Sequence, residues 1–212
     1  MVYIKSKREI ELMKEACKIA NLAQKAIEKA IKPGITTYEL DQIAEKTIRE
    51  NGGIPAEKGY PSGVKGVPDF PASICASVND EVIHGIPSKK VILKEGDLLS
   101  IDLVAYKNGF NGDCARTYIV GKASKEDARL VEITKQAFFE GIKFAKPGNR
   151  IRRYITCNWK LCGKKWLFSC KRISRTWNRK TNAWRPGNTK LWQSRTWNKT
   201  RTSVWHLQLS LW

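Results

Sequence analysis

Two aspartates, Asp102 and Asp113, have the type and spacing to do chemistry together. Asp102 lies inside the apolar run 98–106, where an isolated ionised carboxylate would be costly or would shift its pKa. The Asn-Gly pair at 108–109 is the two-residue turn signal of a β-hairpin, and such a turn sets Asp113 opposite Val104. Asp102 then points to the same face, with Cα atoms roughly 7–8 Å apart. This geometry predicts one divalent metal ion, or a pair of them, between the carboxylates.

Other interpretations of these residues stay open on spacing alone. Asp113 could be an ordinary residue near a turn while Asp102 pairs with a Lys or Arg, and a β-bulge would break the shared face. His84 is one of only two histidines in the chain. A histidine beside a glycine can serve as a structural hydrogen-bond donor or as a catalytic group, because its pKa lies near neutrality.

Two helices and a loop are expected before these residues. Apolar side chains recur every three or four residues over 6–31, which predicts a helix that ends at the Pro-Gly pair 33–34. Thr37, with Asp41 nearby, is expected to open a second helix that ends at the Asn-Gly-Gly run after residue 50. Residues 54–70 are rich in Gly and Pro and predict a long loop.

Strands are expected around the candidate site itself. Residues 72–78 and 98–106 have strand-like patterns, and a return strand should run from 110 to about 120. Ser124 and Asp127 resemble a capping box for a third helix that reaches about residue 144. The expected fold class is therefore α+β.

The charge of the chain is divided unequally. The formal net charge is +19, yet residues 152–212 hold 15 Lys and Arg, all eight Trp and no Asp or Glu. Residues 1–151 hold 24 Lys and Arg against 20 acids. A basic, Trp-containing segment could bind phosphates and stack on bases. Because residues 152–212 have no repeat, no RNA-binding motif and no amphipathic period, we do not expect a nucleic-acid partner.

The six cysteines point to a reducing, cytoplasmic setting. Three lie singly before residue 115, and the other three, Cys157, Cys162 and Cys170, lack a paired C-x2-C knuckle and a nearby His. This spacing fits neither a disulfide framework nor a zinc cluster. There is no secretory signal and no apolar run of about 18 residues, so we expect no membrane partner.

Residues 77–113 resemble a known family. The segments Ser77-Val-Asn-Asp-Glu-Val-Ile-His-Gly-Ile-Pro87, Gly96-Asp-Leu-Leu-Ser-Ile-Asp102 and Gly109-Phe-Asn-Gly-Asp113 look like methionine aminopeptidases. The His-Gly-Ile-Pro form is similar to that of the bacterial-type (type I) class. The resemblance covers about residues 3–151. It implies that residues 1–151 are the N-terminal half of a pseudo-symmetric pita-bread fold.

The resemblance also implies a site and a reaction. Two divalent ions would be held by two Asp, one His and two Glu, with Asp102 binding one ion and Asp113 bridging both. An activated water would hydrolyse the first peptide bond, and His84 would contact the substrate and stabilise the tetrahedral intermediate. Phe70 and Cys75 match the region that lines the methionine side-chain pocket. The metal could be Co, Mn, Fe or Zn, since availability usually decides among them.

The function implied is removal of the N-terminal Met from nascent polypeptides whose second residue is small, by a cytoplasmic monomer. Two alternatives remain. One is a related pita-bread peptidase that cleaves before proline, which would share the Asp pair. The other is a non-enzymatic, basic nucleic-acid-binding protein.

The resemblance stops at Arg152. No acid follows Glu140, and the only later histidine is His206, so the family's remaining His and two Glu ligands are missing. When the coding frame is shifted by one base, residues 175–179 can be read as Gly-His-Gly-Ile-Gly, the family's next metal-binding motif. We predict that 152–212 is a frame-shifted stretch that forms no native half-domain, and that this chain is inactive although the intact gene product is active. An uninterrupted frame in resequenced coding DNA would contradict this prediction.

Overall fold

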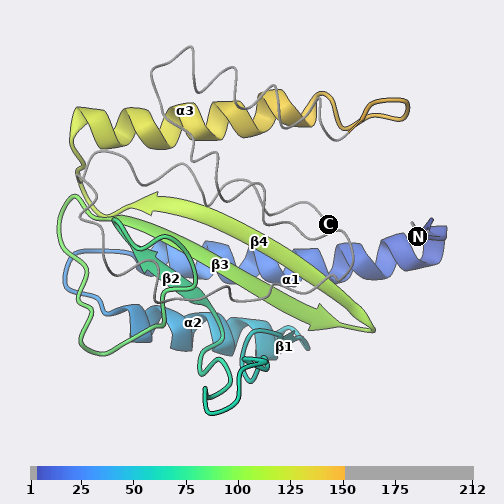
Figure 1. The fold of residues 1–212 in the computed structure, drawn as a ribbon, viewed down its shortest axis with the longest axis horizontal. Helices are drawn as coiled ribbons and strands as arrows, with labels where there is room; N and C mark the ends of the chain where they lie inside the picture. Colours follow the sequence, from blue (N-terminus) through green and yellow to red (C-terminus); the bar gives the residue numbers. More distant parts are fainter. Residues whose placement is uncertain (1–3, 151–212) are drawn as a thin grey trace. The chain divides into compact units, whose positions relative to one another are not determined.

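The computed structural model describes residues 4–150, which fall into two compact units, residues 4–129 and residues 130–150. The elements appear in Figure 1 in the following order: α1 (Lys7–Ala30), α2 (Thr37–Glu50), β1 (Ile54–Pro55), β2 (Cys75–Val78), β3 (Leu98–Lys107), β4 (Phe110–Ile119) and α3 (Lys125–Ile142). The mixture of helices and one antiparallel sheet agrees with the α+β expectation. The predictions made for residues 152–212 lie outside the described residues.

Helix α1 has the amphipathic pattern that its sequence predicts. Its N-terminus is closed by a capping box, in which the Ser6 backbone N–H donates to Glu9 Oε2 (2.7 Å) and the Glu9 N–H donates to Ser6 Oγ (3.3 Å). The residues of its buried face recur at helical spacing: Ala16, Ile19, Ala20, Ala23, Gln24 and Ile27. The helix predicted over 6–31 is therefore confirmed.

Helix α2 begins at Thr37, as the sequence predicts. The N-cap is Thr36, whose backbone N–H donates to Glu39 Oε2 (2.8 Å), and Thr37 is the first helical residue. The Thr37 hydroxyl instead accepts the Ser88 N–H (2.9 Å). The prediction that Thr37 opens this helix is therefore confirmed, and the capping side chain belongs to the preceding residue, Thr36.

Strand β3 is the centre of a four-stranded antiparallel sheet. Strand β4 pairs along the whole of one edge, and β2 and β1 share the other edge end to end, at residues 99–102 and 105–106 of β3. Val104 lies opposite Asp113, as predicted. Asn108 (φ 52°) and Gly109 (φ 88°) both have positive φ, which a two-residue hairpin turn of this hand requires.

The two faces of β3 differ sharply in burial. Leu99, Ile101 and Leu103 are fully buried and belong to the core that α1 and α2 form with the sheet (Figure 1). Ser100, Asp102 and Val104 alternate with them and stay partly exposed. Each apolar side chain buried in this way stabilises the fold by about 1.5–3 kcal/mol. The helices thus cover one face, and the two aspartates lie on the other.

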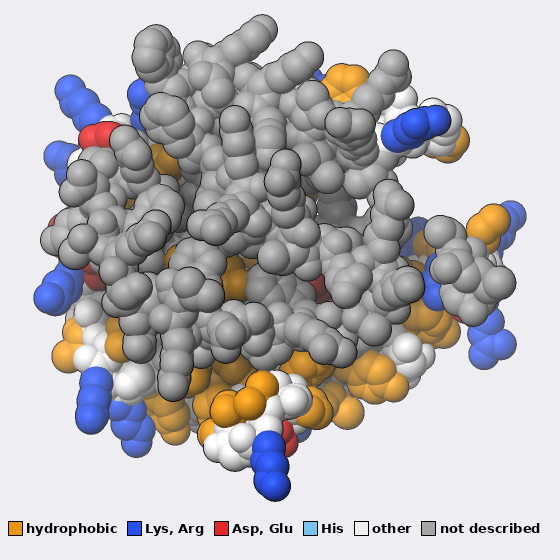
Figure 2. All heavy atoms as spheres, in the orientation of Figure 1, with side chains coloured by type: hydrophobic (Ala, Val, Ile, Leu, Met, Phe, Trp, Pro, Cys, Tyr) orange, Lys and Arg blue, Asp and Glu red, His pale blue; other side chains and the backbone are white. Residues whose placement is uncertain are grey.

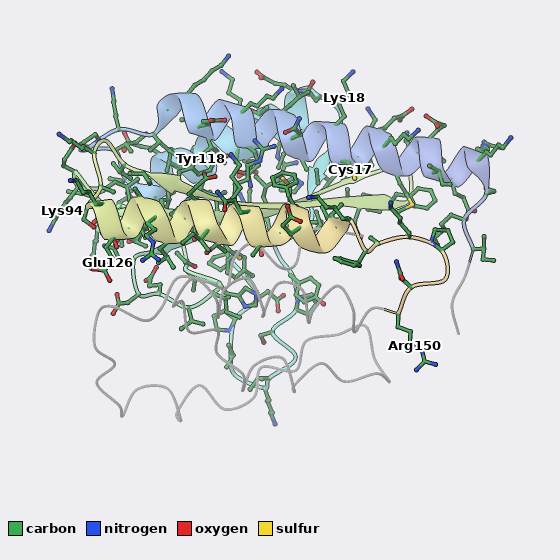
Figure 3. The ribbon with its side chains drawn as sticks, turned by 90° about the horizontal axis from the view of Figure 1, so that it is seen from above. Cys17, Lys18, Lys94, Tyr118, Glu126 and Arg150 are labelled. Carbon is green, nitrogen blue, oxygen red and sulfur yellow. The ribbon has the colours of Figure 1, made fainter. Side chains whose placement is uncertain are left out.

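Close packing and buried hydrogen bonds fix α1 against β4. A Cβ atom at Gly112 would collide with the backbone of α1 at residues 16–17, so a glycine permits this approach. The amide of Gln24 donates to the carbonyls of Ile101 (3.1 Å) and Cys114 (2.9 Å). The Tyr118 hydroxyl, on the side of the sheet that faces α1 in Figure 3, donates to Gln24 Oε1 (2.8 Å). These contacts set the position of the strand that carries Asp113.

Helix α3 has the N-terminal cap that its sequence predicts. The Asp127 N–H donates to Ser124 Oγ (3.0 Å), and this hydroxyl donates to Asp127 Oδ2 (2.7 Å). The helix ends at Ile142, two residues before the predicted end. Within residues 4–150, none of the helices is both long and apolar enough to cross a membrane. Lys and Arg side chains project from the outline of the face drawn in Figure 2.

Candidate metal centre

The β3–β4 hairpin brings Asp102 and Asp113 together. Asp102 lies opposite Ala115. The next pair on the same face, Val104 and Asp113, lies two residues closer to the hairpin turn on each strand. The two aspartates are therefore diagonal neighbours on the face that α1 and α2 do not cover. Both are partly exposed. The pairing register continues without a bulge through this region, so the shared face predicted from the turn is confirmed.

The environment of the pair disfavours two negative charges. Burial, followed by repulsion from Asp113, raises the pKa of Asp102 to about 7. Burial raises the pKa of Asp113 to about 6. Among the described residues, no ion pair includes either aspartate, which argues against the Lys or Arg partner left open by the sequence. The pair therefore needs a proton or a cation.

The donor set suits a divalent cation, but it is incomplete. Carboxylate oxygens are the ligands that hard and borderline divalent ions accept. Within residues 4–150, however, no group of three or more His, Cys, Asp and Glu side chains could hold a metal ion. Asp102 and Asp113 fit as two ligands of a larger set. No acid follows Glu140 in this chain, so further carboxylate ligands would have to come from a C-terminal segment in the restored frame.

Strand β2 adds Cys75 beside the pair. Cys75 lies directly opposite Asp102 across the β2–β3 ladder. Asp41 fixes the two residues before this strand, because its buried Oδ1 accepts hydrogen bonds from the N–H groups of Ser73 (2.7 Å) and Ile74 (3.1 Å). The strand predicted over 72–78 thus begins only at Cys75, since its first residues hydrogen-bond to a helix side chain. Asp41 fixes where Cys75 sits.

Glu57 is a third acidic group at this site, and no pattern in the sequence pointed to it. It follows β1, where the Ala56 N–H donates to the Val104 carbonyl (2.9 Å). Its carboxylate hydrogen-bonds with the Cys75 thiol, and burial, then repulsion from the Asp102–Asp113 pair, raises its pKa well above the usual range. Glu57 lies in a loop rich in Gly and Pro without a periodic pattern. Nothing in its local sequence could have linked it to Asp102 and Asp113, which lie 45 and 56 positions further along the chain.

His84 lies on the outer edge of β2. The Ala76 N–H donates to the Gly85 carbonyl (2.8 Å), and the Gly85 N–H donates to Ser77 Oγ (3.1 Å). A Cβ atom at Gly85 would collide with the Ala76 carbonyl, which explains the glycine after the histidine. His84 has φ 57°, an unusual value for a residue with a side chain. These contacts set its backbone roughly 10 Å, or two strand spacings, from β3.

Burial lowers the pKa of His84. The ring is therefore neutral at pH 7, with one nitrogen able to donate and the other able to accept a hydrogen bond. Phe70 closes the loop that begins near Glu57: the Gly59 N–H donates to its carbonyl (2.8 Å), and its N–H donates to the Tyr60 carbonyl (3.0 Å). The sequence-predicted residues thus come from β2, β3, β4 and the two loops that flank β2.

Several proteins named methionine aminopeptidase are similar to this chain. A methionine aminopeptidase of Clostridium acetobutylicum is 48% identical over 151 residues, which cover 71% of this chain and 58% of that protein. The chain therefore spans less than two thirds of the length of this relative. The bacterial-type methionine aminopeptidase resemblance inferred from residues 77–113 is confirmed.

The fold is similar to that of solved peptidase structures. A crystal structure of methionine aminopeptidase from Thermotoga maritima matches with a TM-score of 0.73 and 34% identity, over 78% of this chain and 64% of that one. A prolidase from Pyrococcus furiosus matches with a TM-score of 0.65 and 26% identity, over 76% of this chain and 44% of that one. The expected pita-bread relationship is confirmed. The aspartate pair lies on the open face of this chain's sheet. Residues 11–156 match the model of metallopeptidase family M24, and the chain therefore belongs to that family.

Proposed function

We propose that the intact protein removes the N-terminal methionine from polypeptides whose second residue is small. The observation that carries this proposal is the aspartate pair on one face of the hairpin, in a chain 48% identical to a protein named methionine aminopeptidase. The substrates would be nascent polypeptides. The protein would act in the cytoplasm as a monomer.

Asp102 and Asp113 would be ligands of two divalent cations, of Co, Mn, Fe or Zn. When bound, such ions polarise a peptide carbonyl and make a water molecule a better nucleophile. A cation would also relieve the repulsion that now raises the pKa of Asp102. The remaining ligands, one His and two Glu by resemblance, would come from the C-terminal segment in the restored frame, because no Glu follows Glu140 in this chain.

His84 would act on the substrate rather than on the metal. Its ring is neutral near pH 7 because burial lowers its pKa. A neutral imidazole N–H can donate a hydrogen bond to an oxygen on which negative charge develops. Gly85, which is hydrogen-bonded to β2, would keep the histidine in position for this contact.

Phe70 and Cys75 would line the pocket for the methionine side chain. Cys75 is buried and lies opposite Asp102, so a side chain that packs on it would lie next to the carboxylates. Burial raises the pKa of the Cys75 thiol, which stays neutral and suits an apolar side chain. The predicted frame shift beyond residue 151 implies that this chain lacks activity, whereas a chain in the restored frame has it.

The test is release of methionine from a Met-Ala-Ser peptide, with Mn²⁺ or Co²⁺ added, by this chain and by a chain translated in the restored frame. We expect turnover only with the restored chain. Robust turnover by the present chain would contradict the predicted frame shift. No turnover by a folded, metal-loaded restored chain would contradict the proposed function.

A second candidate is cleavage before proline, which the structural similarity to a prolidase favours. The same restored chain should be assayed on an X-Pro dipeptide. Preference for X-Pro over Met-Ala would select this alternative. The non-enzymatic alternative predicts instead a salt-dependent affinity for DNA or RNA that disappears when residues 152–212 are deleted.

A further inference from the structure

Glu57 is a buried acidic side chain that the proposed metal chemistry does not use. Its Oε2 atom is buried and has no hydrogen-bond partner among the described residues. Its carboxylate hydrogen-bonds with the Cys75 thiol. Buried polar atoms in native proteins are almost always paired, so an unpaired carboxylate oxygen in a candidate site indicates a missing hydrogen-bond donor.

The surroundings of Glu57 are acidic and lack a basic partner. Asp102 and Asp113 both repel its carboxylate. The adjacent basic residue, Lys58, is engaged elsewhere, because its Nζ forms an ion pair with Glu45 (2.6 Å). Within residues 4–150, no ion pair includes Glu57. Three carboxyl groups therefore gather at one place, which favours a positively charged ligand.

A metal ion is not the ligand that fits Glu57. Together with Asp102 and Asp113 it does not form a group able to hold a metal within the described residues. Asp102 and Asp113 repel the Glu57 carboxylate, but the three side chains are not placed to share one metal ion. The missing partner is therefore a cation that also donates hydrogen bonds.

We propose that Glu57 Oε2 accepts a hydrogen bond from the α-ammonium group of the peptide substrate. This inference rests on the proposed aminopeptidase function. An ammonium group carries a positive charge and several N–H donors, whereas a carboxyl oxygen can accept a hydrogen bond in either protonation state. A charge-assisted hydrogen bond at a buried site is among the stronger ones. Glu57 would thus select peptides with a free N-terminus over those with a blocked one.

The contact is tested by binding rather than turnover. Isothermal titration of the full chain with Mn²⁺ present measures the Kd of Met-Ala-Ser-amide and of its N-acetylated form, which lacks the ammonium group. The variants are Glu57→Leu, which removes both oxygens, and Glu57→Gln, which keeps the size but removes the charge. Glu50→Gln, at the exposed end of α2, is the matched control.

We expect the wild-type chain to prefer the free peptide about tenfold or more. Glu57→Leu should abolish this preference, Glu57→Gln should reduce it several-fold, and Glu50→Gln should keep it. A wild-type chain without preference, or a Glu57→Leu variant that keeps it, would overturn the inference. If the circular dichroism signal shows that Glu57→Leu does not fold, the test depends on Glu57→Gln. An unchanged preference for the free peptide in Glu57→Gln would then overturn the inference.

Titration with Mn²⁺ alone separates this inference from the proposed function. If Mn²⁺ binds but the Glu57 variants keep the preference, the inference fails while the metal site stands. If the preference falls with Glu57 but the restored-frame chain binds no Mn²⁺, the ammonium contact stands and the metal-dependent function fails.

Discussion

The two faces of strand β3 show how one short segment serves both stability and chemistry. The face toward the helices presents Leu103 and its neighbours, which are fully buried in an apolar core. The opposite face presents Asp102 and, across the hairpin, Asp113, whose pKa values are raised by burial. The first face stabilises the fold, and the second lowers its stability by gathering charge. The difference is a property of single positions, because side chains alternate along a strand.

The largest effect should come from truncating the core face. Leu103→Ala removes a fully buried side chain and leaves a cavity, so the free energy of unfolding should fall by about 2–5 kcal/mol. Val104→Ala, one position along and partly exposed, is the matched control. Urea unfolding followed by circular dichroism measures both. An equal loss at the two positions would remove the distinction between the faces.

A second effect concerns metal affinity on the open face. In the restored-frame chain, Asp102→Asn removes a charged ligand, and we expect Mn²⁺ affinity to fall roughly 100-fold or more, in line with loss of a charge-assisted contact. The same change removes repulsion, so the metal-free variant should unfold no more easily than the wild type at pH 8. Glu126→Gln on α3 is the control. Unchanged Mn²⁺ affinity in Asp102→Asn would remove Asp102 from the proposed ligand set.

A third effect is the pH dependence of the metal-free chain. The Asp102 and Asp113 pKa values in the folded chain, about 7 and about 6, lie above their ordinary values, so protonation favours the folded state. This stabilisation is complete below about pH 4 and is lost as the pH rises through about 6 and 7. Between pH 5 and pH 8 the contribution of the pair should fall by roughly 1–3 kcal/mol.

Thermal unfolding at several pH values, without and with Mn²⁺, measures this dependence. Mn²⁺ should reduce the decline, because a cation replaces the missing protons. The double variant Asp102→Asn, Asp113→Asn should show a flatter profile without metal. A wild-type profile as flat as that of the double variant would contradict the raised pKa values.

The smallest effect lies far from either face. Ser6→Ala removes the side-chain cap of α1, and the free energy of unfolding should fall by about 1 kcal/mol. Mn²⁺ affinity should not change, since α1 contacts the sheet on the face opposite the aspartates. A Ser6→Ala variant with weakened Mn²⁺ binding would show that the two faces are coupled.

Local patterns in the sequence predicted much of this fold. The apolar spacing over residues 6–31 predicted α1, and the turn at residues 108–109 predicted the hairpin register that sets Asp113 opposite Val104. These predictions held because helix periodicity and hairpin turns depend on neighbours in the chain. The start of α2 at Thr37 was predicted in the same way, whereas the hydrogen bond that the Thr37 hydroxyl accepts from a distant residue, Ser88, was not.

The sequence by itself determined the helices, the β3–β4 hairpin and the shared face of Asp102 and Asp113, since helix periodicity, strand alternation and a two-residue turn leave little freedom. It did not predict β1, which lies at the start of the expected loop over residues 54–70. Only the tertiary structure decided that Glu57 joins the two aspartates. Strands β1 and β2 meet end to end on one edge of β3, which sets Glu57 beside Cys75 and Cys75 opposite Asp102. That meeting depends on backbone pairing between segments far apart in the chain, and no local spacing encodes it.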